Sequence, residues 1–332
     1  MVSFAEIEDL NLRRRQLRSE AADLASYGRH VSRKLHKSQH KEEFKKRAAE
    51  LNDVFAKLIQ LRKSMHELYD ELLIMERGDE LRDEILFKQP ESSHLGDCHI
   101  CCLPMYGTRT VSYSCCSKII CKGCAHASDI RDLEMRRVQL CPFCLEALPK
   151  TNEASIKQRM KRVEVNDPAA MCHWGKVQHE KGDFSGAFKH FSKAAELGYV
   201  DAHYQLSLTY YEGKGVEKDM GKEIHHLKVA AIGGHPDARY NLGVNEWKNG
   251  DKERAIKHYN IAATQGCDDS IKALLDAFKK GLVIKEKLAA ALRAHHAAVN
   301  ATKSPQREEV EALLFMQRAR VHSAPLQVAA HH

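Results

Sequence analysis

The hydrophobic positions in the first 88 residues keep a helical period almost without a break. Between residues 44 and 75 they fit one heptad register, with Phe44, Leu51, Leu58, Met65 and Leu72 at position a and with Val54, Leu61, Leu68 and Met75 at position d. Only Arg47 interrupts the d series. Four heptads of this quality predict a coiled coil rather than an ordinary amphipathic helix.

An earlier apolar run has a seven-residue register of its own, through Ile7, Leu10, Leu17, Ala21, Leu24, Val31 and Leu35. The two registers do not join, because nine residues separate Leu35 from Phe44 and the stretch 36–41 between them is polar. The segment therefore bends into an antiparallel hairpin, pairs with a second chain, or packs against C-terminal helices of the same chain. We favour a homodimer, since an apolar seam must be covered by something.

A second helical region begins at Pro168 and consists of repeats. A pattern of Ala followed four residues later by Trp or Leu recurs at separations of 32, 36 and 32 residues, at Ala170/Trp174, Ala202/Leu206, Ala238/Leu242 and, degraded, at Ser270/Leu274. Each of the first three copies closes with two alanines and a glycine, at Ala194-Ala195/Gly198, Ala230-Ala231/Gly234 and Ala262-Ala263/Gly266. Small residues let helices approach closely, and neither helix of a unit can bury its apolar face alone. The pattern predicts stacked helix-turn-helix units.

Turn residues separate the two helices of each unit, at 182–183, 213–219 and 250–251. The four extra residues of the middle copy fall in its turn, where insertions are tolerated best. The fourth copy lacks the closing glycine, and its long second helix, 285–300, is expected to cap the stack. Beyond Lys303 the pattern weakens; we expect one more helix at 308–320 within a weakly ordered tail, 303–332.

Between the two helical regions, residues 89–97 are predicted to form a linker and residues 98–149 a small module. Residues 128–138 predict a short helix inside the module, with Ile130, Leu133 and Met135 facing inward. Residues 150–166 predict a connecting helix. Asp167 then suits the N-cap of the next helix, and Pro168 its first position.

The module holds nine of the eleven cysteines. Eight of them form the complement of two tetrahedral all-cysteine zinc sites, namely Cys98, Cys101, Cys115, Cys116, Cys121, Cys124, Cys141 and Cys144. A disulfide framework requires an oxidising compartment, and the N-terminus lacks the apolar segment of a signal peptide. Redox chemistry normally uses one Cys-x2-Cys motif beside a βαβ pattern, which is not present. The cysteines therefore predict two zinc ions.

The eight ligands can be divided in two ways. In a sequential arrangement the first four cysteines hold one ion and the last four hold the other. In an interleaved arrangement the first pair (98 and 101) joins the third pair (121 and 124), and the adjacent pair (115 and 116) joins the last pair (141 and 144).

The stretch resembles a RING finger over about 50 of the 332 residues. The matching features are Ile100 in the first knuckle, the short run from Cys116 to Cys121, and the closing Cys-Pro-x-Cys at 141–144. The resemblance implies the interleaved arrangement. It also implies a ubiquitin ligase that docks a ubiquitin-conjugating enzyme at Ile100, Pro142 and Phe143. The alternative for Ile100 and Phe143 is packing around the metal, because so small a domain has little other core.

Two departures from the RING pattern affect the metal site and the activity. Lys118 stands where the family has a ligating histidine, and a protonated ammonium cannot ligate. We expect Cys115 and Cys116 both to bind instead. The alternative is that His126 or His99 replaces one of these two adjacent ligands.

Leu145 stands where many RING ligases carry the basic residue that holds ubiquitin, and an apolar side chain cannot donate a charge-assisted hydrogen bond. Cys102, next to a predicted ligand, is expected to be a spectator.

The repeats resemble tetratricopeptide repeats, and the sequence YEGKGVEKD at 211–219 with the closing form Lys-x-Ala-Ala-x-x-Gly is more similar to their Sel1-like relatives. The resemblance implies a concave scaffold that binds protein or peptide substrates. A stack that only stiffens the chain is the alternative.

Composition narrows the function further. The net charge of +7 and the 29% of charged residues are spread along helices as runs of mixed sign, which indicates solvated helix faces rather than a nucleic-acid groove. No apolar run approaches the 18 residues of a membrane span. We expect an intracellular protein, cytoplasmic or nuclear, without a signal peptide or transmembrane segment.

The sequence thus predicts a mostly α chain, with coiled-coil helices at 1–88, a two-zinc RING-like module, and an α-solenoid at 167–302. The favoured function is a RING-type E3 ubiquitin ligase with no covalent catalytic residue, in which the module positions two macromolecules. The alternative is a non-enzymatic protein–protein interaction adaptor with a structural zinc module. A nucleic-acid-associated zinc protein is supported least.

Overall fold

A computed structural model describes residues 79–107 and 109–322, together with a few isolated positions between residues 13 and 60. The predicted coiled coil and its homodimer fall almost entirely outside the described residues, as does the chain beyond residue 322. Within the described part, no helix is both long enough and apolar enough to cross a membrane.

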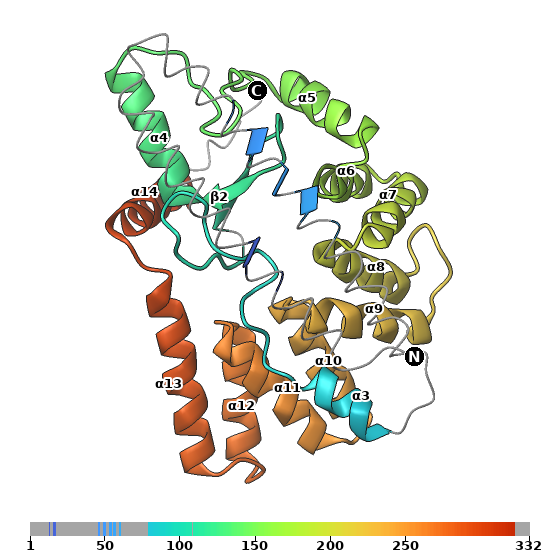
Figure 1. The fold of residues 1–332 in the computed structure, drawn as a ribbon. Coiled ribbons are helices and arrows are strands. Elements are labelled where there is room, and N and C mark those ends of the chain that lie inside the picture. Colours follow the sequence, from blue (N-terminus) through green and yellow to red (C-terminus); the bar gives the residue numbers. More distant parts are fainter. Residues whose placement is uncertain are drawn as a thin grey trace, which may run out of the picture.

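The described chain is mostly helical, with one small hairpin. The strands are β1 (Thr110–Ser112) and β2 (Ile119–Cys121), and the helices are α3 (Asp79–Leu86), α4 (Lys122–Glu134), α5 (Asn152–Glu164), α6 (Pro168–Glu180), α7 (Phe184–Glu196), α8 (Val200–Glu212), α9 (Met220–Ile232), α10 (Pro236–Lys248), α11 (Lys252–Thr264), α12 (Asp268–Lys279), α13 (Lys285–Ala301) and α14 (Pro305–His322). Helices α5 to α14 run in chain order around the segment that carries the hairpin, and the first turn of α14 lies beside α4 (Figure 1). The solenoid therefore curves around the cysteine module, as we call residues 98–149.

The predicted helical repeats are confirmed, as the pairs α6/α7, α8/α9, α10/α11 and α12/α13. Local capping explains where the helices begin. Asp167 caps α6 by accepting hydrogen bonds from the backbone N–H groups of Ala169 and Ala170, with Pro168 at the first position. A carboxylate at this position satisfies amide groups that have no partner inside the helix.

The second helix of each of the first three repeats begins at an aspartate that sequence inspection assigned only to a turn. Asp183, Asp219 and Asp251 each accept a hydrogen bond, of 2.9 to 3.0 Å, from the backbone N–H three residues further on. The closing glycine of each of these repeats has a positive φ, between 74° and 87°, at Gly198, Gly234 and Gly266. Glycine adopts this left-handed backbone without steric cost, which explains the recurring residue.

Small side chains set the spacing between the helices of a repeat. The alanines of the anchors and of the closing pairs are buried almost completely. A methyl group added at Gly175 would lie 2.6 Å from the ring of Phe191, and one added at Gly243 would lie 2.5 Å from the ring of Tyr259. An aromatic ring thus fills the space that the glycine leaves, as close-packed interiors require.

The cysteine module is built on a short hairpin followed directly by a helix. Strands β1 and β2 are antiparallel with Thr110 opposite Cys121, and α4 begins at the next residue. The Cys121 sulfur accepts a hydrogen bond from the backbone N–H of Cys124 at 3.4 Å, so a predicted metal ligand also caps α4.

The predicted orientation of the helix in this module was wrong. Helix α4 spans Lys122–Glu134 rather than 128–138, and Ile130 and Leu133 are 41% and 61% exposed. Met135, just after the helix, is 52% exposed. The core of the module consists of Met105, Tyr113, Ile120 and the cysteines. This core does not extend to the last turns of α4, so the apolar side chains of those turns have no core to pack against and stay exposed.

Helix α3 and the linker pack against the repeats. Leu86 is 3% exposed in a cluster with Leu227 of α9 and Leu242 of α10. The His94 N–H donates to the carbonyl of Gly234 at 3.0 Å. A methyl group on Gly234 would lie 2.6 Å from the Ser92 carbonyl oxygen, so the linker follows the repeat surface closely. Residues 89–97 therefore hold the cysteine module against the repeats.

The buried His258 predicts acid sensitivity. Its side chain is fully buried, neither ring nitrogen has a hydrogen-bond partner among the described residues, and the ring lies 4.7 Å from that of Phe87. Burial, with smaller contributions from the positive charges of Arg239, Arg254 and Lys228, lowers its pKa to about 2, against an ordinary value of 6.5.

In the window between these two pKa values the unfolded chain binds a proton that the folded chain excludes, so stability falls as the pH is lowered. We expect the wild-type chain to lose about 1 kcal/mol more than His258→Leu between pH 6.5 and 5.5. Urea unfolding of both chains at the two pH values measures this difference. Equal losses would contradict it, because all other titrating groups, His173 included, are common to both chains.

Candidate metal centres and the pocket beside them

The structure brings the eight predicted ligands together in two groups. The ligand atoms of Cys98, Cys101, Cys121 and Cys124, which we call the first cluster, lie within 4.8 Å of one another. The same holds for the second cluster, which consists of Cys115, Cys116, Cys141 and Cys144. This grouping is the interleaved arrangement.

The spacing of the sulfurs suits a tetrahedral ion. Sulfurs bound to zinc at 2.3 Å lie about 3.8 Å apart in tetrahedral geometry. The Cys101 and Cys121 sulfurs are 3.9 Å apart, those of Cys116 and Cys141 are 3.7 Å apart, and those of Cys144 and Cys115 are 3.3 Å apart. No disulfide joins the cysteines of the described chain. Each cluster therefore has the donor set and the dimensions of a zinc site.

Three turns of the same form position the sulfurs. In each turn a backbone N–H donates to the carbonyl four residues earlier, at 2.8 to 3.0 Å, and the donating residue has a positive φ near 60°. The three donating residues are Cys102, Ser117 and Leu145. In the first and last turns, Cys-x2-Cys occupies positions one and four. In the middle turn Tyr113 takes position one, and Cys115 and Cys116 take positions three and four. A turn of this form supplies the tight backbone that two adjacent ligands need.

Close packing prevents the four thiols of a cluster from ionising together. In the first cluster, hydrogen bonding with Cys101 lowers the pKa of Cys98 and raises the pKa of Cys124. In the second cluster, hydrogen bonding with Cys115 lowers the pKa of Cys144, while that with Cys116 raises the pKa of Cys115. Like charges at such distances are disfavoured unless a cation lies between them. A divalent ion would let all four sulfurs act as thiolates.

Lys118, which stands where the resemblance to a RING finger leads one to expect a histidine, lies beside the second cluster. Its ammonium group is 5.0 Å from the centre of the Phe143 ring. Burial lowers the pKa of Lys118, and the nearby sulfurs of Cys116 and Cys141 oppose this shift. Neither His99 nor His126 belongs to a group of potential metal ligands in the described chain.

The three predicted docking residues lie at the module surface only in part. Ile100 and Phe143 are partly buried against the module core. The Phe143 ring meets the rings of Tyr113 and His99 edge-on, with centroids 6.0 Å apart in both cases. Pro142 is half-buried, and Leu145 is 36% exposed. Core packing thus accounts for Ile100 and Phe143, and enzyme docking stays a prediction.

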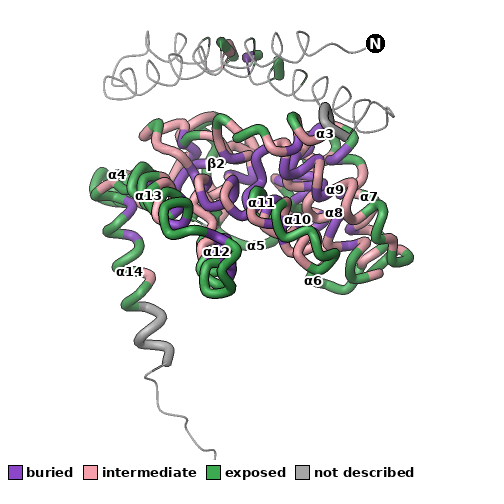
Figure 2. Tube along the Cα trace, turned by 90° about the horizontal axis from the view of Figure 1, so that it is seen from below, coloured by how far each residue is buried: buried purple, intermediate pink, exposed green. Residues whose placement is uncertain are grey.

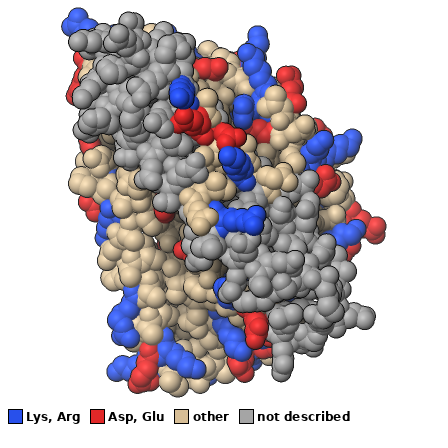
Figure 3. All heavy atoms as spheres, in the orientation of Figure 1, with Lys and Arg blue, Asp and Glu red and all other residues tan. Residues whose placement is uncertain are grey.

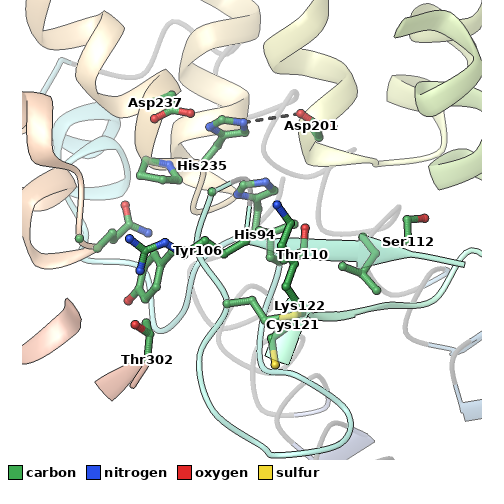
Figure 4. Close-up of a pocket in the computed structure, with 18 of the residues that line it drawn as sticks. His94, Tyr106, Thr110, Ser112, Cys121, Lys122, Asp201, His235, Asp237 and Thr302 are labelled. Carbon is green, nitrogen blue, oxygen red and sulfur yellow. Dashed lines mark ion pairs between the residues drawn. The ribbon is translucent and has the colours of Figure 1, made fainter. Parts of the chain in front are cut away.

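A pocket of about 1100 Å³ lies between the cysteine module and the repeats. Tyr106 and Lys122 of the module line it, together with His94 of the linker (Figure 4). Asp201 and His235 line it from the first turns and caps of the repeat helices. Helix α14 contributes a third side. The linker, the cysteine module and α14 therefore partly cover the helix ends that face the module.

His94, Asp201 and His235 form a third group of potential ligand atoms in this pocket. The rings of His94 and His235 are stacked, 4.2 Å apart and 8° from parallel. The His235 Nδ1 accepts a hydrogen bond from the Ala238 N–H at 3.4 Å, so the ring proton belongs on Nε2, which faces Asp201 at 3.7 Å. A protonated nitrogen cannot ligate.

Asp201 also has a resident cation. The Lys176 ammonium lies 2.7 Å from its carboxylate. Burial raises the pKa of Asp201, but the nearby His235 imidazole and the charge of Lys176 outweigh it and hold the pKa well below its ordinary value. The group is therefore a contact between the linker and the repeats rather than a set of metal ligands.

Sequence inspection missed these contacts. The sequence around His235 carries one weak signal. Proline is common at the first position of a helix, so Pro236 indicates that His235 is the N-cap of a helix. Nothing local indicates that the His235 ring meets His94. The same is true of Arg307, whose side chain reaches the first cluster from α14.

The fold and the clusters define a class of protein, a helical repeat array with a cysteine module packed against it. Comparison with known proteins assigns the repeats: residues 169–199, 200–235 and 236–267 match the Sel1 repeat family. The match covers every repeat except the capping fourth.

The similarity to curated relatives covers only part of the chain. DAP3-binding cell death enhancer 1 of Mus musculus is 27% identical in an alignment of 178 residues that covers 42% of this chain and 35% of the relative. Its Rattus norvegicus counterpart is 24% identical over 52% of this chain and 42% of the relative. Cytochrome c oxidase assembly factor 7A of Xenopus laevis is 32% identical over 26% of this chain and 41% of the relative. The chain thus spans between 35% and 42% of the length of these relatives.

Two solved structures are similar. A Sel1 repeat protein from Oxalobacter formigenes is 30% identical, with a TM-score of 0.40, over 46% of this chain and 66% of that protein. A protective antigen of uropathogenic Escherichia coli is 29% identical, with a TM-score of 0.38, over 45% of this chain and 33% of that protein.

Proposed function

We propose that this chain is a protein–protein interaction adaptor, in which Sel1 repeats bind a protein partner and two zinc ions hold the cysteine module in its folded form. The observation that carries the proposal is the repeat array itself. Residues 169–267 match Sel1 repeats, and arrays of this kind present extended surfaces for proteins. The interleaved clusters support the zinc ions, because they supply two complete sets of four thiol donors.

The names of the relatives support the same class of function. One binds DAP3 and another assists the assembly of cytochrome c oxidase, as their names state. We carry over only the class, a protein that acts by binding other proteins. The charge pattern agrees with it, since basic and acidic side chains are interspersed on the face seen in Figure 3.

The partner is expected on the surfaces that the module leaves open. The turn between α8 and α9 holds the four extra residues, and Tyr211 and Met220 beside it are 56% and 67% exposed. The helix ends at Asp201 and His235 face the cysteine module instead. The concave scaffold predicted from the sequence is therefore partly filled by the chain's own module.

Cross-linking of the full chain in cells, followed by mass spectrometry, tests the adaptor function. We expect cross-links to one recurring protein at lysines of the second repeat, such as Lys214, Lys218 and Lys222. The double variant Tyr211→Ala/Met220→Ala should lose them while keeping its zinc. Partner cross-links confined to residues outside 168–301, or equal capture by an unrelated Sel1 repeat protein, would contradict the proposal.

A ubiquitin ligase is the second candidate, and the interleaved clusters favour it. Leu145 opposes it, because its side chain offers no donor to ubiquitin. The decisive measurement is discharge of a ubiquitin-charged conjugating enzyme by the full zinc-loaded chain, across a panel of conjugating enzymes. The adaptor predicts no acceleration. Acceleration that Ile100→Ala abolishes and Tyr211→Ala does not would establish the ligase instead.

A further inference from the structure

Arg307 connects the C-terminal helix to the first cluster. It lies in the first turn of α14, is 9% exposed, and reaches a sulfur 206 residues earlier in the chain. Its Nη2 donates to the Cys101 sulfur at 3.2 Å and to the Leu103 carbonyl at 3.0 Å. Its Nη1 donates to the carbonyls of Pro104 at 2.7 Å and Thr302 at 2.9 Å. One guanidinium group thus holds both sides of the contact.

The position of Arg307 is fixed by the surrounding backbone. The Ser304 side chain accepts a hydrogen bond from the Arg307 N–H at 3.3 Å. A methyl group added at Gly123, in the first turn of α4, would lie 2.7 Å from the Arg307 backbone nitrogen. At the module's edge Arg109 pairs with Glu311 of α14 at 2.8 Å. Figures 1 and 2 both place α14 beside α4.

The charge of Arg307 matches what the first cluster would carry with metal bound. Four thiolates around a divalent ion leave a net charge of −2. A guanidinium hydrogen-bonded to one of these sulfurs offsets part of this charge, and such charge-assisted bonds are about twice as strong as neutral ones. Partners of this kind orient the ligand and strengthen metal binding.

On the basis of the proposed zinc sites, we infer that Arg307 is a positioning residue of the first cluster and that α14 is therefore part of this metal centre. Arg307 holds the Cys101 sulfur in its ligating orientation from outside the cysteine module. In the described chain, the side-chain hydrogen bond from α14 to a sulfur goes to the first cluster, whereas the second cluster lies beside Lys118. Loss of Arg307 should then weaken one of the two sites and spare the other.

Transfer of zinc from the full chain to a coloured chelator tests this inference, since two ions are followed in one experiment. We expect Arg307→Leu to release one ion about 10 times faster than the wild-type chain, in line with the 10–100-fold effects of outer-shell partners. The second ion should leave at the wild-type rate. Arg307→Lys should give an intermediate rate, because an ammonium keeps the charge but lacks the forked donors.

Two further variants separate positioning from general stability. Gly123→Ala forces α14 away from α4 without altering the guanidinium, and it should release the same ion faster. Arg109→Gln removes another contact between α14 and the module, one that touches no sulfur, and should leave both rates unchanged. Gly123→Ala also serves as the test if Arg307→Leu does not fold.

The outcomes distinguish this inference from the proposed zinc sites. A chain that carries no zinc would overturn the sites and the inference together. Two bound ions, both released from Arg307→Leu and Gly123→Ala at wild-type rates, would overturn the inference and leave the sites standing. Equal acceleration of both ions would overturn it as well, because it would assign Arg307 to overall stability.

Discussion

Replacing Cys121 with alanine is expected to unfold the cysteine module and to reduce its zinc content below two ions per chain. Cys121 is 2% exposed, belongs to the first cluster, pairs in β2 with Thr110, and caps α4 through its sulfur. Zinc contributes on the order of 10 kcal/mol to the folding of small zinc domains. Losing a ligand weakens zinc binding, and the folding free energy lost in this way exceeds the stability of so small a module. Elemental analysis and circular dichroism of the purified chains measure both effects.

Cys172→Ala is the matched control. Its thiol is also buried, at 1% exposure, but it lies in the core of the first repeat rather than in a cluster. Its replacement should leave two zinc ions bound and cost about 1 kcal/mol through lost packing. Retention of both ions by Cys121→Ala would remove this residue from the ligand set, and an equal loss from Cys172→Ala would show that zinc binding reports only general folding.

The repeats were predictable from the sequence because their cause is local. An alanine in an anchor is buried wherever the anchor recurs, and a closing glycine such as Gly198 is required by a left-handed backbone. Such constraints act within one or two helices and leave a periodic trace. The grouping of the cysteines could also be predicted from the sequence. The cysteine spacing resembles that of a RING finger, and this resemblance implies that Cys98 and Cys121 belong to the same cluster.

The packing of the module against the repeats was not predictable, because it depends on pairs far apart in the chain. His94 of the linker meets His235, and Arg307 meets Cys101, and no local sequence pattern indicates either contact. The wrong orientation of Ile130 has a related cause. Helical periodicity predicts which side chains share a face, but only the size of the neighbouring core decides whether that face is covered.

The contact between α3 and the repeats depends on Arg239, whose side chain is fully buried. It donates hydrogen bonds to the carbonyl of Leu86, at the end of α3, and to that of Ala231 at 2.8 Å. Burial lowers the pKa of Arg239 to about 9, so the group stays charged at neutral pH. A positive charge at the C-terminal end of a helix is favourable, which helps to place α3 here.

Arg239→Ala is expected to destabilise the chain by about 3–5 kcal/mol, because it opens a cavity and removes the side-chain donor from the buried carbonyl of Leu86. The carbonyl of Ala231 loses one donor and keeps the Gly234 N–H at 3.1 Å. Urea unfolding measures the loss, and hydrogen exchange should show the amides of α3 opening first. Arg254→Ala is the control, since Arg254 also reaches α3, through Asp83, but its side chain is 26% exposed and paired at the surface. That variant should lose less than about 1 kcal/mol. Equal losses in the two variants would mean that the contact to α3, rather than burial, determines the cost.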